Sequence, residues 1–471
     1  MNFDFAALDA AIDARVKHKE LPGVSVAIHS RDGLLFHKGY GFADVEAGRA
    51  IDADTVMGVA SMSKSMTTLA LAILEAEGKF SFDDPVVKYF PNFRVPGNPV
   101  EDVTCRHLAT HTAGIPPMEP LEWSIAVNTQ SARESKWREE MQRTSPNRMD
   151  EIGQIVDYIA EGRYPTLGQA GEIMSYSNEG YAILSYIADI ASGTTLEAFL
   201  KERVFGPIGM TRSVLDLDGS EAKALAADGN ITRLYGKDEN GELTVDDEWS
   251  VLPPFRGCAC VKSTARDMAR YYQCISDGGV IDGVQAIPAA AAELLVGSAF
   301  PEGEKPFYCL GLNKRVKHGR VICEHAGGLH GVSSFGGMLK GEGFGFSALC
   351  NKGDEDTDDI CWMMYNAIMG RPLEEDHRWL HPAPYAFSEP GMLTGGYICH
   401  EGMPVVVDIL EKDGKLVAQS QDGAGEMVYC GGTWFTIWRE GKYAGRVRFL
   451  VREGKAWAAM FYTRVYRRLD Q

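Results

Sequence analysis

Segments typical of β-strands lie near both ends of the first 370 or so residues, and a helical region separates them. Residues 24–44 (VSVAIHSRDGLLFHKGYGFAD) predict two strands joined at Asp32-Gly33, a common hairpin signal. Residues 320–352 again predict strands, separated by glycine turns. Between them, residues 63–80 (SKSMTTLALAILEAEGKF) have the apolar spacing of a buried helix. This order predicts an α+β fold in which both ends of one domain close an antiparallel sheet.

A proline-rich segment divides the chain. Residues 372–391 contain four prolines and no clean periodicity, which predicts a linker. Beyond it, apolar runs alternate with turn signals such as Asp413-Gly414, as in a small barrel or half-barrel. We therefore expect a main domain at 1–371 and an all-β, barrel-like domain at 392–471.

Acidic residues outnumber basic ones in this chain of 471 residues, 65 to 47, for a net charge of −18 with histidine neutral. Such a field repels nucleic acid and anionic membranes. No apolar run approaches the roughly 18 residues that a membrane-spanning helix needs. We therefore expect neither nucleic acid nor a membrane as a partner.

The first twenty residues (MNFDFAALDAAIDARVKHKE) lack the basic start of a signal peptide and predict an amphipathic helix instead. The ten cysteines are scattered, and no Cys-x-x-Cys pair occurs. Scattered cysteines without an export signal are typical of a reducing compartment. The sequence therefore predicts a cytoplasmic protein.

The C-terminal unit is basic, although the whole chain is acidic. After position 438 it contains nine arginine and lysine residues and three acidic ones. Docking against the acidic first domain, or against a second subunit of a homo-oligomer, explains this excess better than a nucleic-acid site. We expect the unit to shape the cleft rim or a subunit contact without supplying chemistry.

A highly charged segment, residues 131–151, lies within the helical middle. Such a composition is typical of a solvated surface helix or loop. A lid over a functional site is the alternative, and we expect the surface element.

Signatures of several enzyme classes are absent: the Gly-x-Ser-x-Gly elbow, the phosphate-binding loop and the dinucleotide glycine fingerprint. His107 and His111 have the i, i+4 spacing of a helical zinc pair. However, Leu108 occupies the position of the catalytic glutamate in such pairs. We therefore expect structural histidines, no metal and no cofactor.

The motif Ser-x-x-Lys occurs twice. Ser220 and Lys223 lie in a polar stretch, where a helix cap or a surface turn is expected. Ser61 and Lys64 instead come directly at the start of the apolar helix, one turn apart and on one face. A serine hydroxyl is a weak nucleophile until a neighbouring base, here a partly desolvated lysine, removes its proton. The helix dipole also favours negative charge near that serine.

Two further motifs follow in the chain. Tyr-Ser-Asn at 176–178 is its only Tyr-x-Asn, and His-Ala-Gly at 325–327 opens a glycine-rich strand segment. Tyr176 near a lysine could shuttle protons, and the Asn178 amide could hold a substrate carbonyl. The alternatives are a core or capping tyrosine, a turn asparagine and, for His325, a buried structural histidine.

Taken in this order, the three motifs resemble those of the serine β-lactamase and penicillin-recognising superfamily, in its class C-like branch. That branch includes D-aminopeptidases, D,D-carboxypeptidases and β-lactamase-type esterases. The likeness covers roughly residues 5–370 and includes TCRHLATHTAGIP at 104–116. It implies a β-lactamase-like fold, with a C-terminal unit similar to the lipocalin-like barrels of D-aminopeptidases.

The resemblance also implies site roles. Ser61 corresponds to the acylated nucleophile, and Lys64 to its general base. Tyr176 corresponds to the proton shuttle between leaving group and water. Asn178 corresponds to the contact with the substrate amide.

The third motif departs from the β-lactamase pattern. His325 stands where β-lactamases of this branch have the lysine of Lys-Thr-Gly or Lys-Ser-Gly. The backbone N–H groups of Ser61 and Gly328 would form the oxyanion hole. The departure argues against β-lactam turnover.

The resemblance thus implies a serine hydrolase that forms an acyl-enzyme at Ser61 on amides or esters, most like a D-aminopeptidase or a β-lactamase-type esterase. Its substrate would be a small molecule or a short peptide. The alternatives are β-lactamase or D,D-carboxypeptidase activity, and a scaffold of the same fold with weak catalysis.

Overall fold

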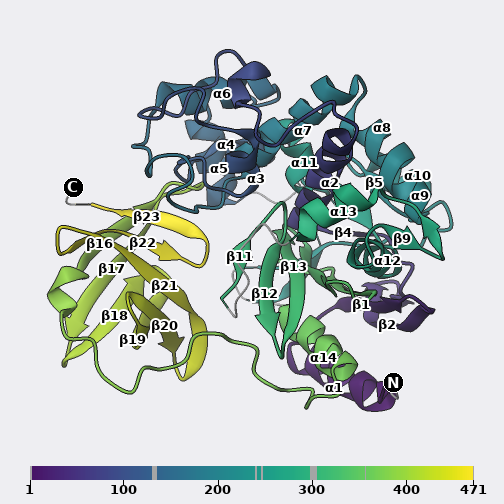
Figure 1. The fold of residues 1–471 in the computed structure, drawn as a ribbon. Coiled ribbons are helices and arrows are strands. Elements are labelled where there is room, and N and C mark those ends of the chain that lie inside the picture. The colour runs from purple at the N-terminus through teal and green to yellow at the C-terminus, as the bar shows by residue number, and fades with distance from the viewer. Residues whose placement is uncertain are drawn as a thin grey trace.

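The computed structural model describes residues 3–129, 135–238, 241–245, 248–297, 305–355 and 357–469. Figure 1 shows two units side by side: a sheet covered by helices, and a separate barrel formed by the C-terminal strands. Within these described residues, no helix has the length and apolar character needed to cross a bilayer.

The main sheet has eight strands in the order β11-β12-β13-β14-β15-β1-β2-β3, and each neighbouring pair is antiparallel. Val24 of β1 lies opposite Cys350 of β15, so the first strand closes the sheet beside the last. The predicted closure of the sheet by both ends of the domain is therefore confirmed. The strands are β1 (Gly23–Ser30), β2 (Gly33–Asp44), β3 (Arg49–Ala50), β11 (Phe307–Tyr308), β12 (Asn313–Lys317), β13 (Arg320–Leu329), β14 (Val332–Leu339) and β15 (Phe344–Cys350).

All eight residues of β1 are buried, so the sheet is covered on both faces at this strand. Val24, Val26 and Ile28 pack into one cluster with helices α1 (Phe5–His18) and α14 (Asp358–Ile368). Ala27, which points the other way, belongs to the cluster of α12 (Ala265–Ser276) and α2 (Ser63–Ala76). The predicted N-terminal helix is thus confirmed as a layer of the core.

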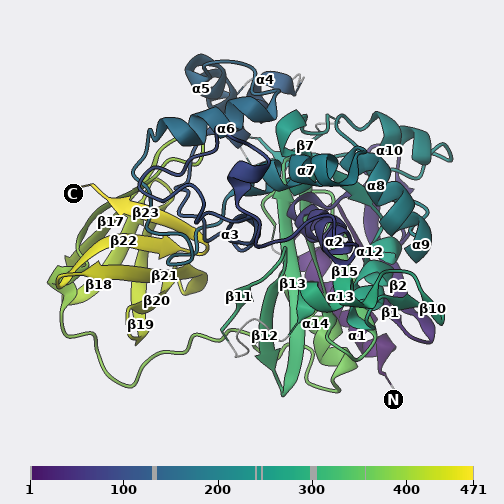
Figure 2. The ribbon, with the colours of Figure 1, turned by 45° about the horizontal axis from the view of Figure 1, so that its top comes forward.

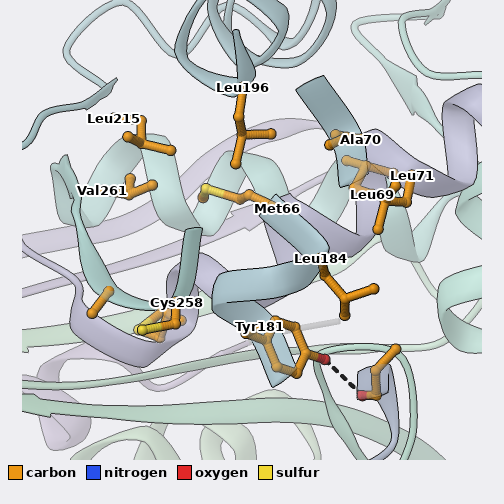
Figure 3. Close-up of a cluster of buried hydrophobic side chains, with 14 of the residues drawn as sticks. Met66, Leu69, Ala70, Leu71, Tyr181, Leu184, Leu196, Leu215, Cys258 and Val261 are labelled. Atoms are coloured by element: carbon orange, nitrogen blue, oxygen red, sulfur yellow. Dashed lines mark hydrogen bonds between the residues drawn. The ribbon is translucent and has the colours of Figure 1, made fainter. Parts of the chain in front are cut away.

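Helix α2 lies at the centre of the helical region. Every residue from Ser63 to Leu74 is buried, as expected for a helix that is apolar around most of its circumference. Figure 3 shows Met66, Leu69 and Leu71 of α2 among side chains from α7 (Asn178–Ser192), α8 (Leu196–Leu200) and α11 (Arg256–Ala259). The helix ends two residues before Gly78, which takes the left-handed φ of 70° that favours glycine.

The remaining helices surround α2 and α7, and in both views α4, α5 and α6 lie on the side that faces the barrel (Figures 1 and 2). They are α3 (Cys105–Ala109), α4 (Pro120–Asn128), α5 (Lys136–Thr144), α6 (Ile152–Glu161), α9 (Gly206–Ile208), α10 (Ser220–Leu225) and α13 (Ala289–Val296), with a π-turn at Lys201–Phe205. Small sheets pair β4 (Met57–Gly58) and β5 (Val214–Leu215) with β8 (Val261–Ser263), β6 (Tyr235–Lys237) with β7 (Leu243–Val245), and β9 (Val280–Ile281) with β10 (Val284–Gln285).

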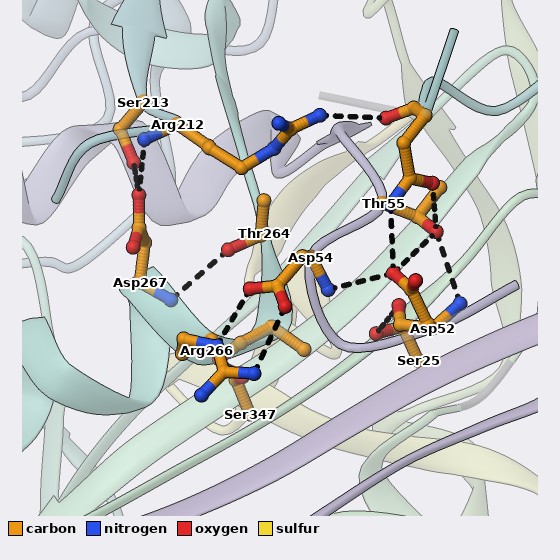
Figure 4. Close-up of polar contacts among 12 residues, drawn as sticks. Ser25, Asp52, Asp54, Thr55, Arg212, Ser213, Thr264, Arg266, Asp267 and Ser347 are labelled. Atoms are coloured by element: carbon orange, nitrogen blue, oxygen red, sulfur yellow. Dashed lines mark hydrogen bonds and ion pairs between the residues drawn. The ribbon is translucent and has the colours of Figure 1, made fainter. Parts of the chain in front are cut away.

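The segment that leads into β4 is anchored by buried polar contacts (Figure 4). Arg266 of α12 donates two hydrogen bonds to Asp54, at 2.6 and 2.9 Å. Asp267 accepts hydrogen bonds from the Arg212 backbone N–H and the Ser213 hydroxyl, both at 2.8 Å. The first pair of bonds joins the approach to residue 61 to α12, which packs on the sheet, and the second pair joins residues 212–213 to the same helix.

The C-terminal unit is a closed barrel of eight strands. Of the two predicted forms, the barrel is therefore confirmed and the half-barrel is wrong. Aromatic residues such as Tyr397, Phe435 and Phe449 fill its interior. The chain enters it after an extended segment that follows α14 (Figure 1). The strands are β16 (Gly395–Cys399), β17 (Val405–Lys412), β18 (Lys415–Ser420), β19 (Gly423–Gly431), β20 (Trp434–Arg439), β21 (Lys442–Arg452), β22 (Lys455–Phe461) and β23 (Arg464–Arg468).

The start of β23 joins the barrel to the helical region. The Tyr176 backbone N–H donates to the carbonyl of Thr463 at 2.8 Å, and the Val465 N–H donates to Ser175 Oγ at 3.3 Å. Leu167 packs against Trp457 of the barrel beside these bonds. The barrel is therefore fixed against the segment that carries the Tyr-x-Asn motif.

Candidate active site

Ser61 lies in a single 3₁₀ turn, η1 (Ala60–Met62), immediately before α2. The preceding Ala60 has a φ of 45°, in the left-handed region that residues other than glycine rarely adopt. Backbone strain of this kind costs on the order of 1–3 kcal/mol and is concentrated at functional sites. Ser61 borders a cleft, whereas Lys64, in the first turn of α2, is fully buried.

Lys64 contacts three oxygen atoms from three parts of the chain. Its Nζ lies 3.1 Å from Ser61 Oγ, 2.9 Å from Asn178 Oδ1 and 3.1 Å from the carbonyl oxygen of Cys258. If two of its N–H groups are held by Asn178 and Cys258, a neutral amine presents its lone pair to the serine hydroxyl. The geometry therefore suits proton transfer from Ser61 to Lys64.

Tyr176 lies beside two basic side chains. Lys64 Nζ is 4.8 Å from the centroid of its ring, and Arg464 Cζ is 4.2 Å from the same centroid. Positive groups at these distances would stabilise negative charge that develops on the phenol oxygen during proton transfer. The Tyr-x-Asn motif thus lies beside the Ser-x-x-Lys motif, as the resemblance implies.

His111 supports Tyr176 from behind. The two ring centroids are 4.2 Å apart, and His111 Nδ1 accepts a hydrogen bond from the Ser177 N–H at 3.0 Å. Burial, followed by the charge of Lys64, holds the pKa of His111 well below its usual value, so the ring is neutral. His107 has a different partner, because its Nδ1 accepts from the Thr104 N–H at the start of α3. Among the described residues, no group of three or more histidine, cysteine or acidic side chains could hold a metal ion.

His325 lies close to Tyr176 but is not one of the residues that line the cleft. The ring centroids of the two residues are 6.2 Å apart, and only 4% of His325 is exposed. Its Nε2 accepts from the Tyr308 hydroxyl at 2.9 Å, while Nδ1–H donates to the Ala326 carbonyl. Burial, with the nearby Lys64 charge, lowers the pKa of His325 to about 3, so the ring is neutral at physiological pH.

Strand β13 passes very close to the serine. A Cβ atom on Gly327 would lie 2.3 Å from the Val59 carbonyl oxygen and 3.1 Å from Ser61 N, so only glycine fits there. At Gly328 a Cβ atom would meet nothing within 4 Å, and this residue lines the cleft. Ser61 and Gly328 therefore border the same space, as an oxyanion hole built from their N–H groups requires.

Two side chains of the barrel complete the site, and the sequence analysis missed both. Asn178 Nδ2 donates to Glu401 Oε1 at 3.1 Å, and Arg464 Nη2 donates to the same oxygen at 2.8 Å. Although burial opposes its charge, the Glu401 carboxylate holds the pKa of Arg464 above its usual value. Asn178 is thus held from both sides, by Lys64 and by the barrel. Only the basic excess near the C-terminus hinted at Arg464, and no motif marks Glu401.

The cleft has a volume of about 910 Å³. Besides Ser61 and Asn178, it is lined by Glu122 of α4 and by Trp137 of α5. Burial, followed by the charge of Glu401, raises the pKa of Glu122 to about 7. Glu122 and Glu401 therefore give the cleft two neighbouring carboxyl groups.

Trp137 comes from the charged segment for which a solvated surface element is expected. Much of that segment does form a surface helix, α5, but this side chain turns into the cleft. Residues 131–134 of the segment lie outside the described residues.

The second Ser-x-x-Lys motif lies elsewhere. Ser220 and Lys223 are both exposed on the short surface helix α10. They do not line the cleft that contains Ser61. The structure therefore separates the two copies of the motif.

Comparison with known proteins gives a consistent result. The family model described as Beta-lactamase matches residues 8–363. Penicillin-binding protein 4* of Bacillus subtilis (strain 168) is 29% identical over 197 residues, which are 42% of this chain and 38% of that protein. The chain thus matches well under half of that relative's length.

Two solved structures share the fold. The octameric penicillin-binding protein homologue from Pyrococcus abyssi has a TM-score of 0.67 at 21% identity, over 98% of this chain and 99% of that one. The D-amino acid amidase from Ochrobactrum anthropi SV3, complexed with D-phenylalanine, has a TM-score of 0.58 at 20% identity, over 78% and 99%. The first likeness includes the barrel, because it covers almost the whole chain.

Proposed function

The chain belongs to the beta-lactamase family, as its motifs predicted, and on that premise we propose that it is a serine hydrolase that forms an acyl-enzyme at Ser61. The contact of Lys64 Nζ with Ser61 Oγ at 3.1 Å carries this proposal, because it pairs a nucleophile with a buried base. In the first step Ser61 Oγ attacks an ester or amide carbonyl, and its proton passes to Lys64. The proton then passes from Lys64 through Tyr176 to the leaving alcohol or amine as its bond to the carbonyl breaks. Water next attacks the acyl carbonyl, and its proton passes through the same two residues to Ser61 Oγ as the acid leaves.

A fluorophosphonate probe tests this proposal directly, because it phosphonylates only activated serines. We expect one adduct per chain, located at Ser61 by peptide mass spectrometry. Lys64→Met should slow labelling by at least about a hundredfold, because it removes the rate acceleration that a positioned general base supplies. An adduct at another serine, or none on folded protein, would reject the proposal.

We further propose that the substrate carries a protonated amino group near the scissile carbonyl, as an amino-acid amide or ester does. Glu122 and Glu401 line the same cleft as Ser61, and burial together with the charge of Glu401 disfavours ionisation of Glu122. Gly402, next to Glu401, packs so closely on Glu122 that a Cβ atom there would lie 2.9 Å from its Cγ. An ammonium group bound between the two carboxyl groups would relieve this repulsion.

This proposal predicts a specific pH dependence. Glu122 has a pKa of about 7, so it is mostly neutral at pH 6 and mostly ionised at pH 7.5. The KM for an alanine ester should therefore fall roughly fivefold over that interval. Glu122→Gln should remove this change, and the N-acetylated ester, which has no ammonium group, serves as the control substrate. An equal pH dependence for both esters in the wild type would contradict the assignment.

Penicillins fit the site less well. His325 is neutral and lies outside the cleft lining, so it cannot give their carboxylate the positive charge that a lysine in the third motif would give. Of the lysine and arginine side chains that line the cleft, Arg464 is paired with Glu401 and Lys352 with Glu355. The acidic Glu122 and Glu401 would also repel that carboxylate. Amino-acid amides and esters are therefore preferred over β-lactams and over D,D-carboxypeptidase substrates, and the D-amino acid amidase of the same fold supports this preference.

We also propose a homo-oligomer in a reducing compartment such as the cytoplasm. The octameric state named for the Pyrococcus abyssi homologue supports the homo-oligomer. Nine of the ten cysteines are buried, which supports the reducing compartment.

A further inference from the structure

A second hollow, which we call the basic groove, lies between the outer face of β21 and the edge strand β11. Its volume is about 750 Å³, and none of its lining residues lines the cleft of Ser61. Thr463 borders the groove while the adjacent Arg464 borders the cleft, so the two hollows lie on opposite sides of one strand. Its volume is typical of a small-molecule site.

Four cationic side chains line the basic groove. Arg446, Arg448 and Arg452 alternate along β21 with the side chains that fill the barrel, so all three point outward. Lys305 joins them from the opposite wall. Among the described lining residues, Glu172 is the only acidic one, and its Oε2 accepts from the Gln169 N–H at 2.8 Å.

Three of these cations lie close to the rings of two tryptophans. Lys305 Nζ lies 4.8 Å and Arg448 Cζ 5.7 Å from the centroid of the Trp434 ring. Arg452 Cζ lies 4.3 Å from the centroid of Trp457. Partial burial, followed by the charges of Arg448 and Arg446, lowers the pKa of Lys305. The cations therefore repel one another, and among the described residues no carboxylate forms an ion pair with any of the four.

Docking on the acidic domain accounts for Arg467, which donates to the Thr166 carbonyl at 3.2 Å, but it gives Arg446, Arg448 and Arg452 no carboxylate partner among the described residues. The wall that faces β21 offers these arginines Lys305, neutral polar side chains and a single carboxylate, Glu172. In a chain of net charge −18, like charges concentrated in a groove with aromatic walls require a negative counterpart.

We propose that the basic groove binds a small organic anion with at least two phosphate or carboxylate groups. Arg446 and Arg448, two residues apart on one strand, can each form a two-pronged contact with such a group. Lys305 would add a third contact from across the groove, and Trp379 and Trp434 would cover an apolar part of the ligand. Walls supplied by two units of one chain favour a small molecule over a protein segment.

Calorimetric titration of the full chain at constant ionic strength tests this proposal. Tripolyphosphate is the probe for a phosphate ligand and citrate is the probe for a carboxylate ligand. Acetate serves as the singly charged control. We expect saturable binding of at least one of the two polyanions and none of acetate. Arg446→Gln with Arg448→Gln should raise its Kd at least tenfold, because two charge-assisted contacts are lost.

The matched control is Lys412→Gln with Lys442→Gln, which removes the same charge from exposed barrel positions outside the groove. This variant should bind as the wild type does. Equal weakening by both double variants would mean general attraction to a positive barrel and would overturn the proposal. Absence of saturable binding would overturn it too. A change of mass in light scattering for the arginine variant alone would instead make the groove an interface between copies.

Discussion

Replacing Ser61 with alanine should lower kcat for the best ester or amide substrate by at least about a thousandfold, while the thermal unfolding midpoint stays close to that of the wild type. The variant loses the nucleophile and with it the covalent route, which is the largest single loss that a serine hydrolase can suffer. The fold should persist, because Ser61 borders the cleft and its side chain packs no part of the core. Initial rates and a thermal melt measure the two effects.

The second Ser-x-x-Lys motif offers a matched control. Ser220→Ala removes the same hydroxyl from an exposed helix and should leave kcat within about twofold of the wild type. Comparable losses for both variants would show that Ser61 has no special role.

Arg464→Met should lower kcat/KM roughly a hundredfold. Removing one partner of this partly buried ion pair leaves the other charge uncompensated in a poorly solvated position. Here that charge is the carboxylate of Glu401, which also accepts from Asn178, so the amide that holds Lys64 should be displaced. Arg464 acts through these neighbours as a positioning residue. Its loss should therefore affect kcat for esters without an amino group as well as for amino-acid esters.

A double variant separates this effect from simple loss of packing. Glu401→Gln in the Arg464→Met background removes the unpaired charge but keeps an acceptor for Asn178, so it should recover at least about tenfold in kcat/KM. If the double variant is as impaired as Arg464→Met, the ion pair does not hold the site together.

The layout of the main domain could be predicted because its elements carry strong local signals. The apolar residues of β1, the hairpin signal around Asp32 and the helix at 63–80 each have a strong local pattern, and buried elements of this kind depend little on distant context. The pairing of β1 with β15 followed from the order of strands around a helical middle.

The candidate site was predicted only where its residues form short motifs. Ser61 and Lys64 are one helical turn apart, so their contact is encoded locally. Glu401 and Arg464 reach the site through the docking of a separate barrel, which depends on the surfaces of two folded units. No spacing along the chain records such a contact. Likewise, nothing in the charged segment distinguished Trp137, which turns into the cleft, from its solvent-facing neighbours.

His325 shows the limit of a motif by itself. The sequence motif indicates that this residue lies near the nucleophile, and the structure does place its ring 6.2 Å from that of Tyr176. The orientation of its imidazole depends on a hydrogen bond with Tyr308, which lies on the short edge strand β11. The sequence of that strand has no recognisable pattern. The hydrogen bond from Tyr308 and the surrounding burial fix a neutral ring.

The closure of the sheet also determines when the protein can fold during synthesis. Val24 pairs with Cys350, so the first strand has no neighbour on that side until more than three hundred further residues have been made. At about 5–20 residues per second, this takes tens of seconds, during which an apolar strand edge stays exposed on the ribosome. The polar frame around Asn178 forms later still, because it needs Arg464. The strand edge of β1 and the polar frame around Asn178 are therefore completed only after the segments that pair with them have been synthesised.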